Sequence, residues 1–249
     1  MGAHDDANTG SPRRTAAAFT RLLPPGDPAG AAEIVDALDL AARARSGTGA
    51  GDGSETGADA RRPYTMLNMT STVDGRASIG GRSGAISSPA DRELFHALRA
   101  SVDAVIVGAG TVRADDPMLT VRNFTPANAV PTAGLDPLRV VLGRVPAGAR
   151  IAPALEHQGD IAALLDDLGG RGVLQLMVEG GADVAGQFHR AGLVDEYVLY
   201  LAPAFMGGDR GQRAFAGEGA PTMADLTRGR FVAIDRLGDD LRIVIVVER

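Results

Sequence analysis

The sequence contains no cysteine and no tryptophan, and both absences narrow the range of possible functions. Without cysteine there are no disulfides, no cysteine-based zinc sites and no thiol nucleophile. The four histidines do not fall at a paired spacing, which disfavours a histidine metal site. Aromatic residues make up only 4% of the chain, so we expect a mostly aliphatic core and no platform for stacking nucleic-acid bases.

The chain also lacks long apolar runs and an excess of positive charge. No apolar stretch approaches the roughly 18 residues of a membrane helix, and the polar N-terminus has no apolar segment typical of a signal peptide. The net charge of −6 disfavours a nonspecific nucleic-acid partner, which would need a basic surface. The sequence therefore predicts a cytoplasmic protein with no membrane and no nucleic-acid partner.

The N-terminal quarter of the chain differs in composition from the rest. A short apolar segment at 19–23 is followed by a proline-rich turn at 24–28, and apolar residues then recur at near-helical spacing over 29–45. Residues 46–62 carry no bulky apolar side chain, which is typical of a flexible linker. We therefore predict an N-terminal extension and linker over 1–62 and a catalytic body over 63–249.

In the catalytic body, strands and helices alternate along the chain. We predict strands over 64–70, 104–108, 138–142, 174–178 and 196–202, helices over 89–100, 161–168 and 182–191, and an antiparallel pair of strands over 231–237 and 241–247. This order is typical of an α/β protein with three layers, αβα. Its sheet should be mixed and mainly parallel, with a C-terminal antiparallel hairpin.

Two glycine-containing turns follow predicted strands, and each precedes a polar or helical segment. The first is Gly108-Ala109-Gly110-Thr111, and the second is Glu179-Gly180-Gly181, directly before a helix. Glycine lets the backbone approach a ligand closely, and a helix N-terminus offers free N–H donors to phosphate. Together the turns predict a dinucleotide site in which Gly108, Gly110 and Gly180 contact the cofactor. The alternative is that these glycines only reverse the chain. The standard dinucleotide motif fails because Arg113 stands in place of its third glycine.

Several charged residues lie near these turns. Asp115 follows Thr111 by four residues, where a carboxylate can orient a cofactor amide or steer a proton. Arg99 and Arg122 are candidate anion clamps for a substrate phosphate, although exposed surface charge is the simpler interpretation from the pattern alone. Asp74, in Val-Asp-Gly-Arg, is predicted to form a turn.

Five ordered blocks of sequence carry a resemblance to a known family. TSTVDGRAS, ISSPADRELFHALRA, VGAGTVRADDPMLTVR, VEGGADVAGQF and LVDEYVLYLAPAFMGG resemble the riboflavin-biosynthesis pyrimidine reductase, which also forms the C-terminal domain of a bifunctional deaminase–reductase. The resemblance covers residues 63 to 249 and implies a dihydrofolate-reductase-like fold and a homodimer. It also implies NADPH-dependent reduction of the ribosylamino group of a 5-phosphoribosylaminopyrimidine to ribitylamino.

The resemblance assigns roles to particular positions. Thr70, Thr111 and Asp115 match residues that contact NADPH, and the pyrophosphate-binding turn and helix start match Gly181, Ala182, Asp183 and Val184. The positions that contact the phosphoribosyl-pyrimidine match Ser83, Arg99, Leu119, Arg122 and Glu179. Asp115 and Glu179 are the catalytic candidates, no metal is implied, and Asp74 is expected to shape the site.

The chain departs from the family pattern at a few positions. The H-x-E and P-C-x-x-C signatures of a zinc deaminase are missing, which excludes deamination by this chain. Gly143-Arg144 replaces a usual Asp-Ser, which makes Arg144 a candidate contact for the 2′-phosphate of NADPH, and Ala85 replaces a bulky residue.

Two alternative functions stay open at this point. One is a paralogous dihydrofolate-reductase-like NADPH reductase that acts on another pterin or pyrimidine, and the other is a non-catalytic NADPH-binding protein. Within the favoured reading, the sequence leaves open whether the pyrimidine is deaminated before or after reduction.

Overall fold

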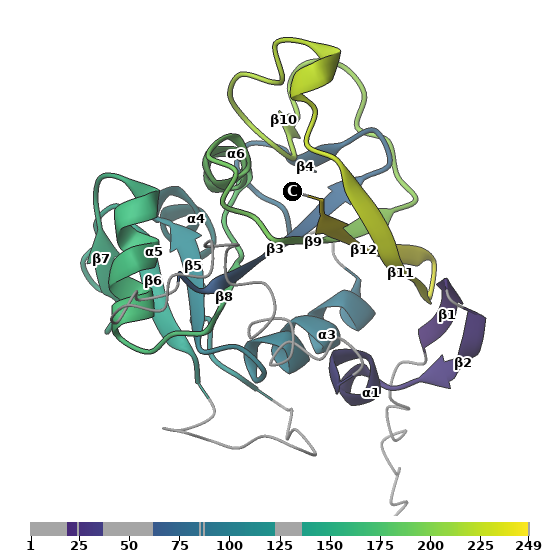
Figure 1. Ribbon diagram of the computed structural model, residues 1–249, viewed down its shortest axis with the longest axis horizontal. Helices are drawn as coiled ribbons and strands as arrows, with labels where there is room; N and C mark the ends of the chain where they lie inside the picture. The colour runs from purple at the N-terminus through teal and green to yellow at the C-terminus, as the bar shows by residue number, and fades with distance from the viewer. Residues whose placement is uncertain are drawn as a thin grey trace, which may run out of the picture.

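The computed structural model describes residues 19–23, 25–36, 62–84, 86, 88–122 and 136–248. Its elements follow one another along the chain as shown in Figure 1. They are β1 (Phe19–Leu23), β2 (Pro25–Ala29), α1 (Ala31–Asp36), β3 (Tyr64–Thr72), β4 (Arg76–Ser78), α3 (Pro89–Arg99), β5 (Ala104–Gly108), α4 (Ala109–Asp115), β6 (Leu138–Leu142), β7 (Leu155–His157), α5 (Ile161–Gly170), β8 (Gln175–Val178), α6 (Ala182–Arg190), β9 (Glu196–Ala202), β10 (Gln212–Arg213), η1 (Met223–Asp225), β11 (Gly229–Leu237) and β12 (Asp240–Val247).

One ten-stranded sheet forms the centre of the molecule, in the order β2-β1-β11-β12-β9-β3-β8-β5-β6-β7. The strands from β9 to β7 pair in parallel, whereas β12, β11, β1 and β2 add to β9 as an antiparallel extension. All nine residues of β3 are buried, as expected for a central strand covered on both faces. The predicted mixed sheet with a C-terminal hairpin is confirmed.

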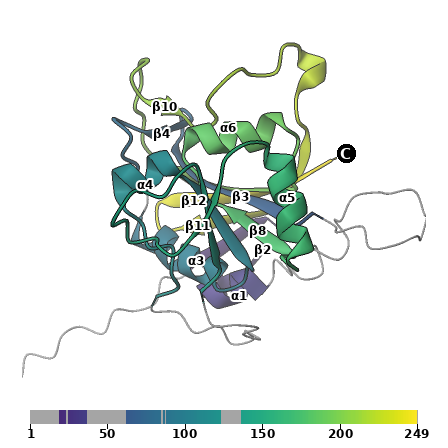
Figure 2. The same ribbon diagram turned by 90° about the vertical axis from the view of Figure 1, so that its left-hand side faces the viewer.

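Helices cover both faces of the sheet, which gives the predicted three layers (Figure 2). On one face, residues of α1 and α3 such as Ile34, Leu94 and Leu98 share an apolar cluster with Val105 and Val198 of the sheet. A second cluster joins α5 and α6 to the opposite face. Burial of these aliphatic side chains, rather than aromatic packing, stabilises the layers.

Helix α3 begins at a capping box that fixes its direction. The Ser88 side chain accepts a hydrogen bond from the Asp91 backbone N–H at 3.2 Å, and the Asp91 carboxylate accepts one from the Ser88 N–H at 3.2 Å. Pro89 occupies the first turn, where its missing N–H costs nothing. Because Phe95 and Arg99 are four residues apart, the helix presents both on the same side.

Residues 109–115 form helix α4, so the prediction of a simple turn there is wrong. Gly108 has an extended backbone and serves as the N-cap, while Asp116, at φ 41°, ends the helix in the left-handed region. The glycines suggested a turn, but only Gly110 lies inside the helix, and the remaining residues tolerate helical geometry.

Residues 25–29 form a strand, so the prediction of a turn over this segment is also wrong. Strand β2 pairs with β1, and β1 in turn pairs with β11 of the C-terminal hairpin. Proline is tolerated in β2 because this strand lies at the edge of the sheet, where an N–H donor is not needed on the outer side. The predicted linker over 46–62 lies outside the described residues except for Arg62, and the domain division at 62/63 stays a prediction.

Candidate functional site

A cavity of about 400 Å³ opens at the carboxyl ends of β3, β5 and β8. Ligands of α/β sheets commonly bind in this position, because polar loops follow the strands there. The predicted site residues that line it are Thr70, Ser83, Arg99, Gly108, Gly110, Thr111, Asp115, Leu119, Glu179, Gly180, Gly181, Ala182, Asp183 and Val184. The fold thus brings together segments that are more than a hundred residues apart in the sequence.

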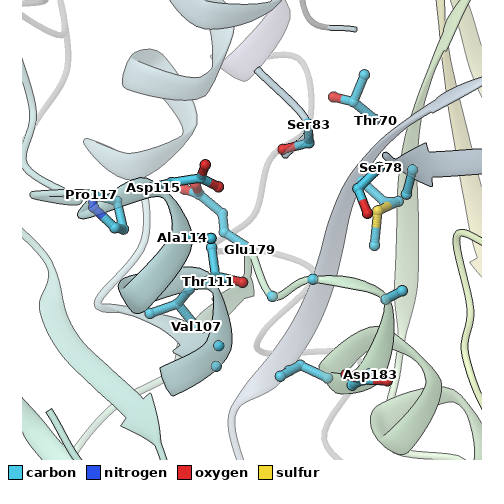
Figure 3. Close-up of a pocket in the computed structure, with 18 of the residues that line it drawn as sticks. Thr70, Ser78, Ser83, Val107, Thr111, Ala114, Asp115, Pro117, Glu179 and Asp183 are labelled. Carbon is cyan, nitrogen blue, oxygen red and sulfur yellow. The ribbon is translucent and has the colours of Figure 1, made fainter. Parts of the chain in front are cut away.

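Figure 3 shows two walls of this cavity. Thr111 and Asp115 project from α4 on one side, where Glu179 also lies, and Thr70, Ser78 and Ser83 stand across from them. Thr111 and Asp115 face the cavity together because they are one helical turn apart. The four-residue spacing of Thr111 and Asp115 in the sequence thus brings both side chains to one cavity.

The two glycine turns meet at the base of the cavity. A Cβ atom added to Gly181 would lie 3.2 Å from the Thr111 hydroxyl oxygen, so the start of α6 and the first turn of α4 are in close approach. Gly181 is the N-cap of α6 and provides no capping side chain. The first N–H groups of α6 therefore border the cavity without a side-chain acceptor from the cap, which suits an anionic ligand.

Packing accounts for two of the glycines more directly than ligand approach does. A Cβ on Gly180 would lie 2.3 Å from the Val184 Cβ, and one on Gly108 would lie 2.9 Å from Val184 Cγ2. The Val184 side chain occupies the space beside both turns, so no side chain fits at either position. At Gly110, by contrast, the nearest atom to an added Cβ is an Arg113 nitrogen at 3.9 Å, which leaves the backbone open.

Arg99 and Glu179 form a bidentate ion pair in the cavity wall. The distance from Arg99 Nε to Glu179 Oε1 is 2.6 Å, and that from Nη2 to Oε2 is 2.5 Å. The two side chains are only 11% and 9% exposed. Burial acts to lower the pKa of Arg99, but the Glu179 carboxylate outweighs it and raises that pKa above its usual value. The predicted anion clamp is thus neutralised by a carboxylate in the structure.

Like Arg144, Arg122 is a predicted contact residue that does not line the cavity. Its side chain is exposed, and its backbone N–H donates to His96 Nδ1 at 3.3 Å. Burial, together with the charges of Arg99 and Arg122, lowers the pKa of His96. His96 is half-buried and absent from the lining residues, as expected for a packed histidine.

Asp115 stands at the rim of the cavity and is exposed. Its partial burial raises the pKa of its carboxyl, while the positive charge of Arg82 acts in the opposite direction. A carboxyl in this position holds its proton to a higher pH than an ordinary aspartate does. This property suits a group that exchanges a proton with a bound molecule.

Several lining residues were not predicted from the sequence. Asn68 is only 5% exposed, and its Oδ1 has no hydrogen-bond partner among the residues that the structure describes. The sequence did carry a signal for Asn68, because a polar residue in the middle of a buried strand suggests a contact with a ligand. Phe95 packs edge-on against Tyr200 with ring centroids 4.9 Å apart while also lining the cavity. Gln212 reaches the cavity only through strand pairing, for which the sequence gives no local signal.

The part of the chain that the structure describes has neither a cluster of metal-ligating side chains nor a membrane-spanning helix. No group of three or more histidine, cysteine, aspartate or glutamate side chains is arranged to hold a metal ion there. None of the helices in these ranges is both long enough and apolar enough to cross a bilayer.

Comparison with known proteins matches the same part of the chain. The model of the RibD C-terminal domain family matches residues 63–243. A relative in Methanothermobacter thermautotrophicus, named 2,5-diamino-6-ribosylamino-4(3H)-pyrimidinone 5′-phosphate reductase, is 33% identical over 219 residues, covering 75% of this chain and 99% of the relative. Riboflavin biosynthesis protein RibD of Mycobacterium tuberculosis is 33% identical over 192 residues, which cover 74% of this chain and 54% of that protein.

Among solved structures, RibD of Acinetobacter baumannii superposes with a TM-score of 0.67 at 28% identity, covering 76% of this chain and 59% of that one. The chain thus spans little more than half of the RibD proteins but nearly the whole of the archaeal reductase. The match to the family model includes both glycine turns and the Arg99–Glu179 pair. The chain belongs to the RibD C-terminal domain family.

Proposed function

We propose that the protein is an NADPH-dependent oxidoreductase of riboflavin biosynthesis, which reduces the ribosylamino group of a 5-phosphoribosylaminopyrimidine to ribitylamino. The observation that carries the proposal is the single cavity in which the start of α6, Asp115 and the Arg99–Glu179 pair come together. The name of the full-length archaeal relative describes a reductase of this kind. Nothing in the site favours a pterin substrate or an idle binding protein over this reading.

The residues present fit a dinucleotide. The N-terminus of α6 would hold the pyrophosphate, with Gly181 and Asp183 beside it, and Thr111 closes the same end of the cavity. The buried Asn68 Oδ1 lacks a donor in the described part of the chain, and an amide or hydroxyl of a bound molecule would supply one. When bound, the nicotinamide would supply a hydride to C1′ of the opened ribosylamine.

The chain's own residues then have two tasks. They hold the pyrimidine and ribose against the bound nicotinamide and exclude water from between the two molecules. This orientation of the reactants lowers the barrier to hydride transfer. They also supply a proton, because adding a hydride to the C1′=N bond gives a neutral amine only when the nitrogen gains a proton. Asp115 is the carboxyl at the cavity rim whose pKa is raised, and we assign it that role.

Steady-state oxidation of NADPH tests the function directly. We would compare 2,5-diamino-6-ribosylamino-4(3H)-pyrimidinone 5′-phosphate, its deaminated uracil counterpart and dihydrofolate. Turnover of at least one ribosylamino compound, with none of dihydrofolate, is expected. The diamino compound is tested first, because it appears in the name of the full-length archaeal relative. No turnover of either ribosylamino compound would sink the assignment.

Preference for NADPH over NADH is proposed to depend on Arg144. Gly143, directly before it, lies close against the start of α4, since a Cβ on Gly143 would lie 2.8 Å from the Ala109 Cβ, and the Arg144 side chain is exposed. We expect Arg144→Ala to raise KM for NADPH by about 10- to 100-fold, the value of one charge-assisted hydrogen bond, and to leave KM for NADH unchanged. Arg150→Ala, which removes another exposed arginine nearby, is the control. Equal effects on both nucleotides would contradict the proposal.

We further propose a homodimer formed through the apolar side of the C-terminal strands. Ile234 and Ile243 lie opposite each other in β11 and β12 and are half-buried, and Phe231 on the same side is 54% exposed. Sedimentation equilibrium is expected to give the mass of a dimer for the wild type and of a monomer for Ile243→Asp. Leu174→Asp, at an exposed leucine on another strand end, should stay dimeric. A wild-type monomer at micromolar concentration would refute the dimer.

We also infer that residues 63–249 form the reductase unit and that β1, β2 and α1 extend it. Support comes from the family match over 63–243 and from the pairing of β1 with β11. A cytoplasmic location stays a prediction from the sequence.

A further inference from the structure

The segment between β9 and β10 lies across the turn between β3 and β4, and the Asp74 carboxylate binds the middle of it. Asp74 accepts hydrogen bonds from the backbone N–H groups of Met206 and Gly207 at 3.3 and 2.8 Å. It also accepts one from the Thr72 hydroxyl at 2.5 Å. The Thr72 hydroxyl and the Gly207 N–H lower the pKa of Asp74, so the carboxyl is an ionised acceptor at neutral pH.

Arg76, two residues further along, binds the next part of the same segment, from Gly208 to Gly211. Its Nη1 donates to the Gly211 carbonyl at 3.0 Å and its Nη2 donates to the Gly208 carbonyl at 2.6 Å. The Ala214 N–H donates to the Gly75 carbonyl at 2.9 Å, which continues the attachment past β10. One acidic and one basic side chain thus bind successive parts of a segment that lies about 130 residues away in the sequence.

This attachment determines where one cavity wall stands. With the segment in place, β10 pairs with β4, so that Gln212 lies opposite Ser78 (Figure 1). The Ser78 hydroxyl donates to Gln212 Oε1 at 2.7 Å, and both residues line the cavity. Asp74 and Arg76 are not among the lining residues, so any effect they have on a ligand must act through this wall.

We propose that Asp74 and Arg76 are positioning residues, which fasten residues 204–213 to the β3–β4 turn and thereby set the Ser78–Gln212 wall against the bound ligands. In Figure 3, Ser78 of this wall stands across the cavity from Thr111 and Asp115. The kinetic part of the inference rests on the proposed reductase function. The structural part, attachment of the segment, does not depend on it.

The first measurement is limited trypsin digestion of the whole protein without ligand. Arg210 is exposed within the fastened segment. Asp74→Ala is expected to speed cleavage after Arg210 by about tenfold, because loss of an ionised acceptor raises the population of the detached segment. Asp209→Ala, which removes an exposed carboxylate from the same segment, should leave the rate unchanged. Arg171, which caps the C-terminal end of α5 and is 52% exposed, serves as a reference cleavage site for general loosening.

The second measurement is the division of the kinetic effect between KM and kcat. Asp74→Ala is expected to raise KM for NADPH or for the pyrimidine by about tenfold with kcat within about twofold of wild type, since a misplaced wall weakens binding without removing a reacting group. The KM of Asp74→Asn, which keeps one acceptor oxygen, should lie between the KM of the wild type and that of Asp74→Ala.

Three results would overturn the inference. One is equal cleavage after Arg210 in Asp74→Ala and Asp209→Ala. Another is a matching rise in cleavage after Arg171, which would indicate general unfolding instead of local detachment. The third is unchanged KM for both ligands despite faster cleavage after Arg210. If the wild type turns over no ribosylamino substrate, the proposed function fails, and the trypsin result still decides whether Asp74 fastens the segment.

Discussion

Replacing Glu179 with leucine is expected to lower the free energy of unfolding by about 3 kcal/mol, because it leaves the Arg99 guanidinium buried without its counter-charge. The pair is bidentate, and both members are about nine-tenths buried, so the remaining charge cannot be fully solvated. This loss lies at the lower end of the destabilisation expected for a broken buried ion pair, because the cavity admits water. Arg99→Met should cost a similar amount, and chemical denaturation of each variant measures both.

The double variant, Arg99→Met with Glu179→Leu, separates stability from function. Exchange of a whole buried ion pair for apolar side chains is often neutral for stability, so most of the lost free energy should return. Activity should not return, because Glu179 is proposed to contact the pyrimidine through charge-assisted hydrogen bonds. We expect kcat/KM to stay at least about 10- to 100-fold below the wild type in both single variants and in the double variant. Recovery of turnover together with stability would show that the pair is only structural.

Replacing Asp115 with asparagine is expected to lower kcat by about 100-fold or more, the usual contribution of a positioned proton donor. Burial raises the pKa of this carboxyl, so the protonated donor persists to a higher pH than for an ordinary aspartate. The wild-type rate should therefore fall as pH rises through that raised pKa, since the donor loses its proton. Asparagine has no group that titrates in this range, so the rate of the variant should not show this fall with rising pH, the alkaline limb of the pH profile.

Asp116→Asn is the matched control for this experiment. Asp116 neighbours Asp115 but does not line the cavity, and its Oδ1 accepts the Arg150 backbone N–H at 2.8 Å. Asparagine keeps that acceptor and tolerates the left-handed backbone at φ 41°. The control variant therefore removes one carboxylate charge, as Asp115→Asn does, but from a residue with no proposed role in proton transfer. An Asp115→Asn enzyme with unchanged kcat, or with the limb retained, would rule out proton donation by Asp115.

Local sequence patterns predicted most elements correctly, and failed where a segment's partner mattered more than its composition. A continuous aliphatic run identified β5, in which all five residues are buried, because a strand buried on both faces has no polar alternation. The glycine and proline signals were wrong for α4 and β2. Helix α4 follows a glycine N-cap, and β2 is an edge strand that tolerates proline. In both cases the neighbours that the segment packs against, and not its own composition, determine its conformation.

The sequence by itself determined the chemistry that this protein has available. Its lack of cysteine, its two glycine turns and the residues Thr111, Asp115 and Glu179 all follow from the order of amino acids. Only the tertiary structure decided which of them meet: Arg99 with Glu179 across 80 residues, and Ser78 with Gln212 across 134. It also placed Arg122 outside the cavity lining and Asn68 within it. The physical reason is that such contacts arise from strand order and layer packing, which depend on the burial of distant side chains together rather than on any local preference.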